Sequence, residues 1–358
     1  MKIIDILTKK IDLKIKKVFR VAYTSRSYSY GVYVKILTDE GVYGLGEALP
    51  NANVTGETQD SVIAAIMRMK QFLIGLDPCD IENVHTAMNK AIFANPAAKA
   101  GVDLACYDIM GKVKQMPVYK LLGSCVNKIA TDMTIGINPP EEMAQDAVNY
   151  VNDGFRYLKV KCGINPDDDL QAIKLIREAV GGSIEIRTDF NQGYTIDSAV
   201  EVLKKMKEYN VLEAEQPLPA WDILGMAKLK KISPIPIMID EGAHSPEQVI
   251  NACELDACDL VNIKLMKCGG IYPALKIAKI AKEYGKKCIV GCMTESKLAI
   301  SAGAAVVSAA FDNMIIPDLD GFLSLAKDNP GVTGGLCVDK DTFTLSEKPG
   351  FGFDEFDF

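Results

Sequence analysis

Two kinds of hydrophobic pattern follow one another along the chain. Residues 1 to about 50 alternate between apolar and polar positions, with a turn signal at Asp39-Glu40-Gly41, and this alternation predicts a small antiparallel meander. Apolar residues then recur at helical spacing over 59–74, 81–93 and 97–113. From about residue 128, short apolar runs alternate with amphipathic helical patterns, which is typical of repeated β/α units.

The unit that begins with YLKVK at 157–161 shows this pattern most fully. Asn165-Pro166-Asp167 supplies a cap and a first turn after the strand, and an amphipathic helix follows. Further strands are predicted at 183–189, 211–215, 235–240, 260–264, 287–291 and 313–317. Seven or eight such units in about 200 residues favour a (β/α) barrel over an open doubly wound sheet.

A polar or reactive side chain lies at the end of each predicted strand. These residues are Thr134, Lys161, Asp189, Glu215, Asp240, Lys264, Cys292 and Asp318. Subtraction of the residue numbers gives successive separations of 27, 28, 26, 25, 24, 28 and 26. Such a near-constant step is expected when every strand of a barrel places one residue at the C-terminal mouth, where barrel enzymes carry their chemistry. The spacing therefore predicts functional residues on one rim.

Composition excludes several classes of function. The chain has 358 residues and a formal net charge of −7 without a block of like charges, which argues against nucleic acid as a partner. No apolar stretch of about 18 residues occurs and the N-terminal residues carry charges throughout, so we expect a cytoplasmic protein without a membrane partner. Ten scattered cysteines and only two histidines disfavour a disulfide framework, a zinc site and a histidine-based triad.

Three consecutive predicted strands end in carboxylates, at Asp189, Glu215 and Asp240. Three carboxylates that converge at a poorly solvated mouth repel one another, unless their pKa values rise or a cation compensates their charge. Oxygen ligands without histidine or cysteine select a hard ion, above all Mg²⁺. Each acid alone is better explained as a helix N-cap or a salt-bridge partner, but three in register favour a metal site.

Lysines flank this carboxylate trio on both sides. Lys159 and Lys161 share one strand face and are predicted to point into the barrel, and Lys264 ends the strand that follows the trio. A lysine near other cations and screened from water loses its proton more easily, which makes it a general base. The alternative is that the lysines only neutralise the acids. Bases on both sides of a metal-bound carboxylate favour removal of an α-proton on one face and its return on the other, with Mg²⁺ and Lys159 stabilising the enediolate.

Several motifs together resemble the muconate-lactonizing-enzyme subgroup of the enolase superfamily along nearly the whole chain. They are GVYGLGEALP at 41–50, the segment 101–123, KVK at 159–161, the acids Asp189, Glu215 and Asp240 with Asp240-Glu241-Gly242, and NIKLMKCGG at 262–270. The resemblance implies an α/β fold, a modified TIM-type (β/α)7β barrel with an N-terminal α+β capping domain. The expected ranges are 1–125 for the cap, 126–325 for the catalytic barrel and 326–358 for a C-terminal segment that returns to the cap.

Within that subgroup, IIPDLDGF at 315–322 resembles the DxD motif of dipeptide epimerases. The resemblance implies that Asp318 and Asp320 bind the α-ammonium group of a dipeptide, and that Thr134, Lys159 and Cys292 line the substrate site. A turn formed by Asp-Leu-Asp-Gly is the structural alternative. The predicted enzyme holds one Mg²⁺ per active site on Asp189, Glu215 and Asp240, and uses Lys161 and Lys264 to invert the C-terminal α-carbon of L-Ala-L-Xaa dipeptides. We also expect a homo-oligomer.

The cap offers a clue to the side chain of Xaa. In members of the resembled family that act on L-Ala-L-Glu, an arginine stands five residues after a phenylalanine, but counting from Phe19 reaches Thr24 here, with Arg20 and Arg26 nearby. The surrounding tyrosines favour an apolar, aromatic or cationic Xaa over glutamate. Alternatives with the same metal and lysines are o-succinylbenzoate synthase, N-acylamino-acid racemase and muconate cycloisomerase, whose substrates lack an ammonium group. A non-catalytic binding barrel is a more distant alternative.

Overall fold

The computed structural model describes residues 1–327, 329, 332–354 and 358. Its N-terminal part is an antiparallel meander of β1 (Ile3–Val21), β2 (Thr24–Thr38) and β3 (Tyr43–Ala48), as the alternating pattern predicted. Three helices pack against this meander and one another: α1 (Gln59–Leu73), α2 (Ile81–Ala91) and α3 (Pro96–Val113). The predicted helices at 59–74, 81–93 and 97–113 are confirmed to within two residues at each end. We call residues 1–123 the cap below.

Two glycines of β3 set the close packing of the cap. A Cβ atom at Gly44 would lie 2.0 Å from the carbonyl oxygen of Ala105, and one at Gly46 would lie 2.0 Å from the carbonyl oxygen of Gly101. Because no side chain fits at that separation, α3 can rest directly on the backbone of β3 only where the strand carries glycine. This contact explains why the GVYGLGEALP motif and the segment at 101–123 occur together.

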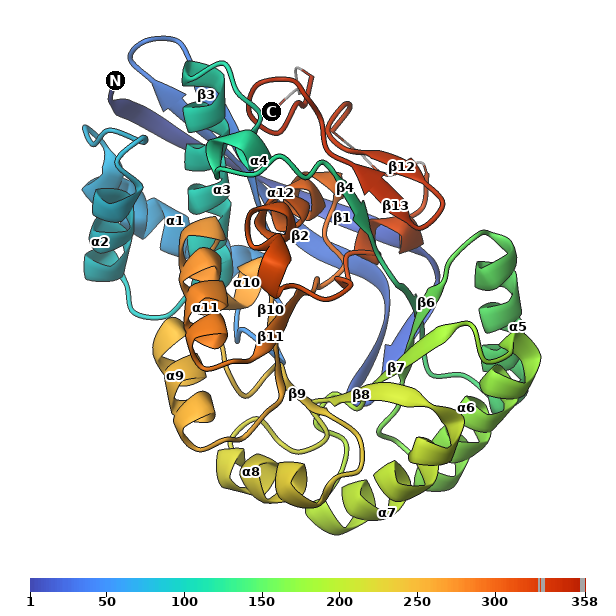
Figure 1. The fold of residues 1–358 in the computed structure, drawn as a ribbon. Helices are drawn as coiled ribbons and strands as arrows, with labels where there is room; N and C mark the ends of the chain where they lie inside the picture. Colours follow the sequence, from blue (N-terminus) through green and yellow to red (C-terminus); the bar gives the residue numbers. More distant parts are fainter. Residues whose placement is uncertain (328, 330–331, 355–357) are drawn as a thin grey trace.

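Seven parallel strands form a curled sheet in the order β11-β10-β9-β8-β7-β6-β5, and helices surround it (Figure 1). The strands are β5 (Met133–Ile135), β6 (Tyr157–Lys161), β7 (Glu185–Asp189), β8 (Val211–Glu215), β9 (Ile237–Ile239), β10 (Leu260–Ile263) and β11 (Lys287–Val290). The helices are α5 (Pro140–Asn152), α6 (Pro166–Val180), α7 (Ile196–Met206), α8 (Ile223–Ile232), α9 (Pro246–Glu254), α10 (Leu265–Cys268), α11 (Ile271–Glu283) and α12 (Lys297–Ala309). The predicted (β/α) barrel with an N-terminal cap is confirmed.

The eighth position of the barrel is closed by an irregular segment. The strand predicted at 313–317 is wrong as a regular element, because only Met314 forms a bridge, to Cys288. The segment still joins β11 to the other side of the barrel: Asp318 N donates to Val290 O at 3.0 Å, and Asp132 N donates to Pro317 O at 3.2 Å. Pro317 has no N–H to donate to a ladder, which limits regular pairing here.

The C-terminal residues return to the cap. A small sheet pairs β12 (Cys337–Asp339) and β13 (Thr342–Thr344), which follow the barrel strands, with β4 (Lys128–Ala130), which precedes them. The short helix α4 (Val118–Leu121) follows α3 in the chain. Phe351 N then donates to Asp108 Oδ1 of α3 at 3.0 Å, and Val118 N donates to Gly350 O at 2.9 Å. Gly350 has φ +70° and lies so close to Asp108 that a Cβ atom would stand 2.2 Å from Oδ1, so this contact also requires glycine.

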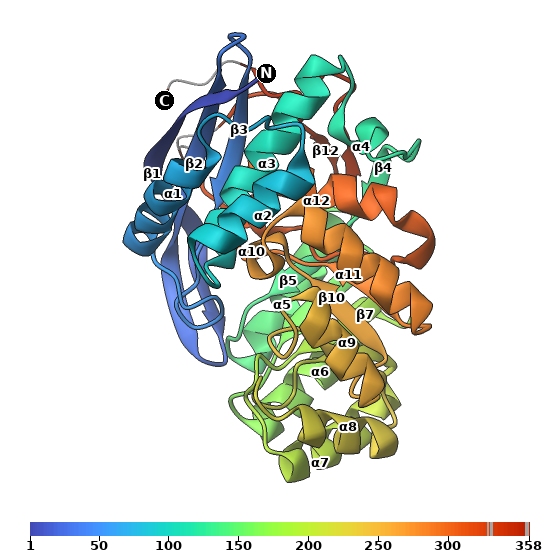
Figure 2. The ribbon, with the colours of Figure 1, turned by 90° about the vertical axis from the view of Figure 1, so that its left-hand side faces the viewer.

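The long hairpin of β1 and β2 extends beside the barrel, and its tip reaches the barrel mouth (Figure 2). Ile137 N, just after β5, donates to Arg20 O at the tip at 2.9 Å. The cap therefore covers the edge at which the strands end. In the part of the chain that the structure describes, no helix is both long and apolar enough to cross a membrane.

Candidate active site

A cavity of about 550 Å³ lies between the hairpin tip and the C-terminal ends of the barrel strands. The barrel contributes Thr134, Lys161, Lys264, Cys292, Asp318 and Asp320 to its lining. The cap contributes Phe19, Tyr23 and Arg26. Six predicted residues from five segments therefore face one space, and all but Asp320 belong to the series with constant spacing.

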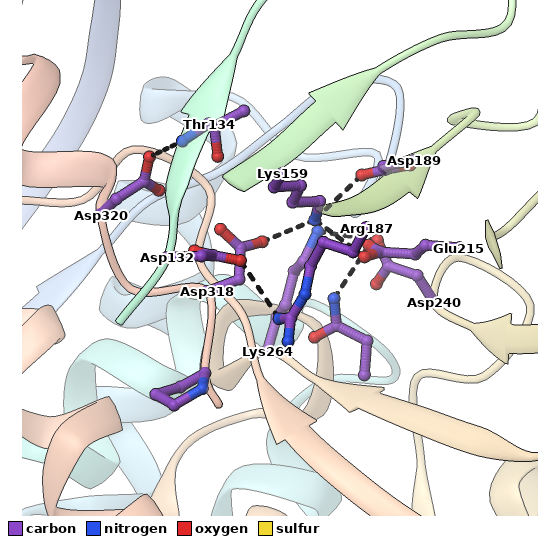
Figure 3. Close-up of polar contacts among 12 residues, drawn as sticks. Asp132, Thr134, Lys159, Arg187, Asp189, Glu215, Asp240, Lys264, Asp318 and Asp320 are labelled. Carbon is purple, nitrogen blue, oxygen red and sulfur yellow. Dashed lines mark hydrogen bonds and ion pairs between the residues drawn. The ribbon is translucent and has the colours of Figure 1, made fainter. Parts of the chain in front are cut away.

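The three carboxylates of the trio lie beneath this cavity and are almost completely buried. Lys159 Nζ stands among the acids, 3.0 Å from Asp189 Oδ2, 2.8 Å from Glu215 Oε2 and 2.6 Å from Asp318 Oδ2 (Figure 3). One ammonium group in contact with three carboxylates from β7, β8 and the closing segment shows that these strands converge on one point. Lys159 itself does not line the cavity but supports its floor.

Three further lysines hold the edges of the trio. Lys161 Nζ lies 2.6 Å from Asp189 Oδ2 on one side, and Lys264 Nζ lies 2.7 Å from Asp240 Oδ2 on the other. Lys267 Nζ contacts the second oxygen of Asp240 at 2.6 Å and donates to the carbonyl oxygen of Asn262 at 3.1 Å. Because β6 and β10 flank β7, β8 and β9 in the sheet, Lys161 and Lys264 stand on opposite sides of the carboxylates.

Burial and the lysines together determine the charge of this cluster. Burial and the neighbouring Asp189 charge raise the pKa of Glu215 to about 8. Burial alone would also raise the pKa of Asp240, but Lys264 and Lys267 lower it well below its usual value. The same contacts raise the pKa of Lys264 well above its usual value, against the effect of burial, because Asp240 and Glu215 stabilise the ammonium form. The acids thus require nearby positive charge.

The chemistry of these donors fits a divalent hard cation. Asp189, Glu215 and Asp240 offer only carboxylate oxygens, and Glu215 Oε2 and Asp240 Oδ1 each contact a lysine ammonium group, at 2.8 Å and 2.6 Å. Carboxylate oxygens in a buried anionic cluster that attracts cations are the ligands that Mg²⁺ prefers. The same residues that hold lysines here are therefore suited to hold Mg²⁺.

A second anionic group forms the opposite part of the rim. Cys292, Asp318 and Asp320 each offer one ligand atom, and these three atoms all lie within 4.8 Å of one another. Asp320 Oδ2 accepts from Thr134 N at 2.7 Å, which fixes its carboxylate across the cavity mouth. Burial and the Asp318 charge raise the pKa of Asp320 to about 7, whereas Lys159 lowers the pKa of Asp318 against the effect of burial. This pair can accept a cationic group from a ligand.

Sequence reasoning missed several residues that support this site. Asn262 Nδ2 donates to Glu215 Oε1 at 2.9 Å, and Asn191 Nδ2 donates to Glu241 Oε1 at 3.1 Å. Arg187 lies deeper in the barrel, 3.1 Å from Asp132 Oδ2. Asn262 and Arg187 stand two residues before Lys264 and Asp189 on the same strands, so the rule that residues i and i+2 share a strand face identifies both.

Glu47 joins the cap to the substrate side of the barrel. It lies on β3, is fully buried, and accepts from Ser296 N at 2.8 Å, from Ser296 Oγ at 2.6 Å and from Ala299 N at 3.1 Å. Ser296 and Ala299 begin α12, directly after the cavity-lining residues Cys292, Met293 and Thr294. A cap carboxylate therefore positions a loop of the barrel rim.

Comparison with known proteins agrees with this architecture. Residues 3–123 match the sequence family of the mandelate racemase/muconate lactonizing enzyme N-terminal domain, and residues 142–355 match the enolase C-terminal domain-like family. The chain belongs to the muconate-lactonizing-enzyme group of the enolase superfamily. The predicted resemblance is confirmed over nearly the whole chain.

Three similar proteins narrow the type of reaction. An L-Ala-D/L-Glu epimerase of Clostridium acetobutylicum is 39% identical over 98% of this chain and 98% of its own. An N-succinyl-L-Arg/Lys racemase of Bacillus cereus is 39% identical over 99% of this chain and 95% of its own. The crystal structure of a dipeptide epimerase from Enterococcus faecalis, complexed with Mg and L-Leu-L-Tyr, is 38% identical with TM-score 0.96, covering 99% of this chain and 100% of that one. The protein is therefore an isomerase, and these relatives support epimerase activity.

Proposed function

We propose that this protein is a Mg²⁺-dependent dipeptide epimerase that inverts the α-carbon of the C-terminal residue of L-Ala-L-Xaa dipeptides. The observation that carries the proposal is the position of Lys161 and Lys264, which line one cavity from opposite sides of the buried carboxylate trio. Such a pair can remove a proton from one face of a carbon and return a proton to the other. The Mg-complexed structure of the Enterococcus faecalis relative supports Mg²⁺ as the cofactor.

The residues of the cavity divide the reaction among them. Asp189, Glu215 and Asp240 would hold Mg²⁺, which would supply positive charge to the substrate carboxylate as the α-proton leaves. One of Lys161 and Lys264 takes that proton, and the other, in its ammonium form, donates to the opposite face. A cation on Asp240 would compete with Lys264 for that carboxylate and would weaken the contact that favours its ammonium form. Lys159 keeps Asp318 and the trio together from below.

The ammonium group of the dipeptide is proposed to bind Asp318 and Asp320. A racemase of N-succinyl amino acids is the second candidate function, and the 39% identity to the Bacillus cereus enzyme favours it. The two candidates differ at this pair, because an N-acylated substrate leaves Asp320 without a compensating cation. That uncompensated charge costs about 3–5 kcal/mol by analogy with a broken buried ion pair. N-Acetyl-L-Ala-L-Phe should therefore react far more slowly than L-Ala-L-Phe, and Asp320→Asn should narrow the difference.

The side of the cavity formed by the cap favours an apolar or aromatic Xaa. Val18, Phe19 and Tyr23 of the cap line it, together with Met293 of the barrel, whereas Thr24 does not. Arg26 also lines it, and no acceptor among the described residues receives its buried Nε–H. An unpaired guanidinium disfavours the cationic Xaa that the sequence also allowed, and it can stack on an aromatic ring. It also attracts a carboxylate, so L-Ala-L-Glu is the decisive comparison.

A library of dipeptides incubated with the Mg²⁺-loaded enzyme in D₂O tests the proposal. Mass spectrometry should show gain of one deuterium at the C-terminal residue of the substrates, and chiral analysis should show both epimers. Lys161→Ala and Lys264→Ala serve as matched controls that keep the cavity but lose one base each. Values of kcat/KM for L-Ala-L-Phe, L-Ala-L-Lys, L-Ala-L-Glu and N-acetyl-L-Ala-L-Phe then rank the substrates. Preference for the acetylated compound would overturn the dipeptide assignment, and preference for L-Ala-L-Glu would overturn the assignment of Xaa.

A further inference from the structure

A second cavity, of about 650 Å³, lies between the cap and the outer side of the barrel. The cap lines it with the end of α2, the loop that follows and the start of α3, and the barrel lines it with the starts of α9 and α11 and with α10. It shares no lining residue with the catalytic cavity. This second cavity is therefore separate from the catalytic cavity.

The balance of charge in this cavity is positive. Lys99 is only 8% exposed, and its Nζ donates to the neutral Asn89 Oδ1 at 2.8 Å. Lys276 lies at the exposed edge, 3.9 Å above the ring of Tyr272. Among the described residues, neither lysine forms an ion pair with a carboxylate. Burial lowers the pKa of Lys99, while the nearby Glu57 charge acts in the opposite direction without forming an ion pair with it.

The acids around the cavity are already engaged. Glu247, the acidic residue of the lining, accepts from Ser245 Oγ at 2.7 Å. Glu57, which lies near Lys99, accepts from Ala97 N at 2.9 Å and Ala98 N at 3.1 Å at the start of α3. Lys267, the third lysine of the lining, is paired with Asp240. Lys99 and Lys276 are thus the cationic groups left to bind a ligand.

We propose that this cavity binds a small organic anion, a carboxylate or a phosphate ester, between Lys99 and Lys276. A charge-assisted contact with an anion would give Lys99 the direct ionic partner that it lacks among the described residues. His244, whose buried Nε2 accepts no hydrogen bond, can receive a donor group of the same ligand. The ligand would also lie against Lys267, which holds Asp240, so the cavity adjoins a residue of the catalytic cluster without being part of it.

The two histidines of the chain provide a site-specific test, because His85 and His244 both line this cavity. Their ring Cε1–H signals in NMR spectra of the Mg²⁺-loaded enzyme should shift and saturate on titration with phosphate or with succinate, against a sodium chloride control of equal ionic strength. The anion that saturates at the lower concentration identifies the preferred class. Absence of a saturable shift with either anion would overturn the proposal.

Variants separate a site from general charge attraction. Lys99→Gln and Lys276→Gln should each weaken binding about tenfold or more, as loss of one charge-assisted contact implies. Lys279→Gln is the matched control, because Lys279 lies on the same helix but contacts Glu283 at 4.0 Å outside the cavity. Equal affinity in all three variants would contradict the site. NMR shifts that depend on protein concentration and not on anion concentration would overturn the proposal and would indicate contact between two copies of the chain. Phe93, which is 92% exposed at the cavity edge, could make such a contact.

Discussion

Replacement of Glu47 by glutamine should change how the stability of the protein depends on pH. Burial raises the pKa of Glu47 from 4.5 to about 7, so the folded protein keeps this proton over a range in which the unfolded chain has lost it. Because the pKa of Glu47 is higher in the folded state, this carboxyl group contributes its full stabilisation of the folded protein below pH 4.5. That contribution declines as the pH rises and is lost above about pH 7. A shift of this size corresponds to about 3 kcal/mol.

Glutamine stays neutral at every pH, so Glu47→Gln lacks this decline. It also lacks one acceptor, because one of the two carboxylate oxygens is replaced by an amide NH₂ group, which donates and cannot accept, at a cost of about 1 kcal/mol. The wild type should therefore be the more stable protein at pH 5, and the variant should equal or exceed it at pH 8. The difference between their free energies of unfolding should change by about 3 kcal/mol between these values.

Urea unfolding at several pH values, followed by circular dichroism, measures this difference. All other titrating groups are common to both proteins and cancel in the comparison. Glu283→Gln, at an exposed position of α11, is the control and should show the wild-type pH dependence. A constant difference between wild type and Glu47→Gln from pH 5 to pH 8 would refute the reasoning, since it would show that Glu47 is ionised in both states.

Three further predictions concern the catalytic cluster. Asp189→Asn, Glu215→Gln and Asp240→Asn should each abolish epimerisation and weaken Mg²⁺ binding measured by calorimetry, and full turnover in excess EDTA would contradict the metal site. Lys161→Ala and Lys264→Ala should each stop epimerisation. Because each lysine serves one face of the α-carbon, one of these variants can still exchange the α-proton of one stereoisomer with D₂O. Epimerisation at the wild-type rate in both variants would show that these lysines are not the bases. Lys267→Met should lower the free energy of unfolding by about 3–5 kcal/mol, because Asp240 loses a buried partner, and an unchanged melting temperature would contradict that role.

The sequence predicted the local features of the fold well because they depend on side-chain period. The strands at 157–161 and 211–215 were predicted at their observed bounds, and the charged or polar ends of the strands do face one mouth. The closing segment was predicted wrongly as a strand at 313–317, since apolar content indicates burial but not whether a partner ladder continues. The expected domain ranges, the homo-oligomer, the cytoplasmic location and the roles of the site residues stay predictions.

Contacts between distant segments were beyond sequence reasoning. Lys159 was placed inside the barrel, but its central position among three carboxylates depends on the curvature of the whole sheet. Glu47 and Ser296 lie 249 residues apart, and no local pattern indicates that they meet. That Arg26 Nε finds no acceptor among the described residues likewise depends on how the hairpin tip covers the mouth. Such features follow from packing, whereas the elements follow from periodicity.

The return of the C-terminal residues to α3 has a consequence for the order of folding during synthesis. Phe351 N, which donates to the buried carboxylate of Asp108, is made 243 residues after it. The cap can form its meander and helices early, yet this part of its surface lacks its final cover until residues 350 and 351 have been made. A deletion of residues 350–354 should therefore impair the cap, although the deleted residues lie far from it in the sequence.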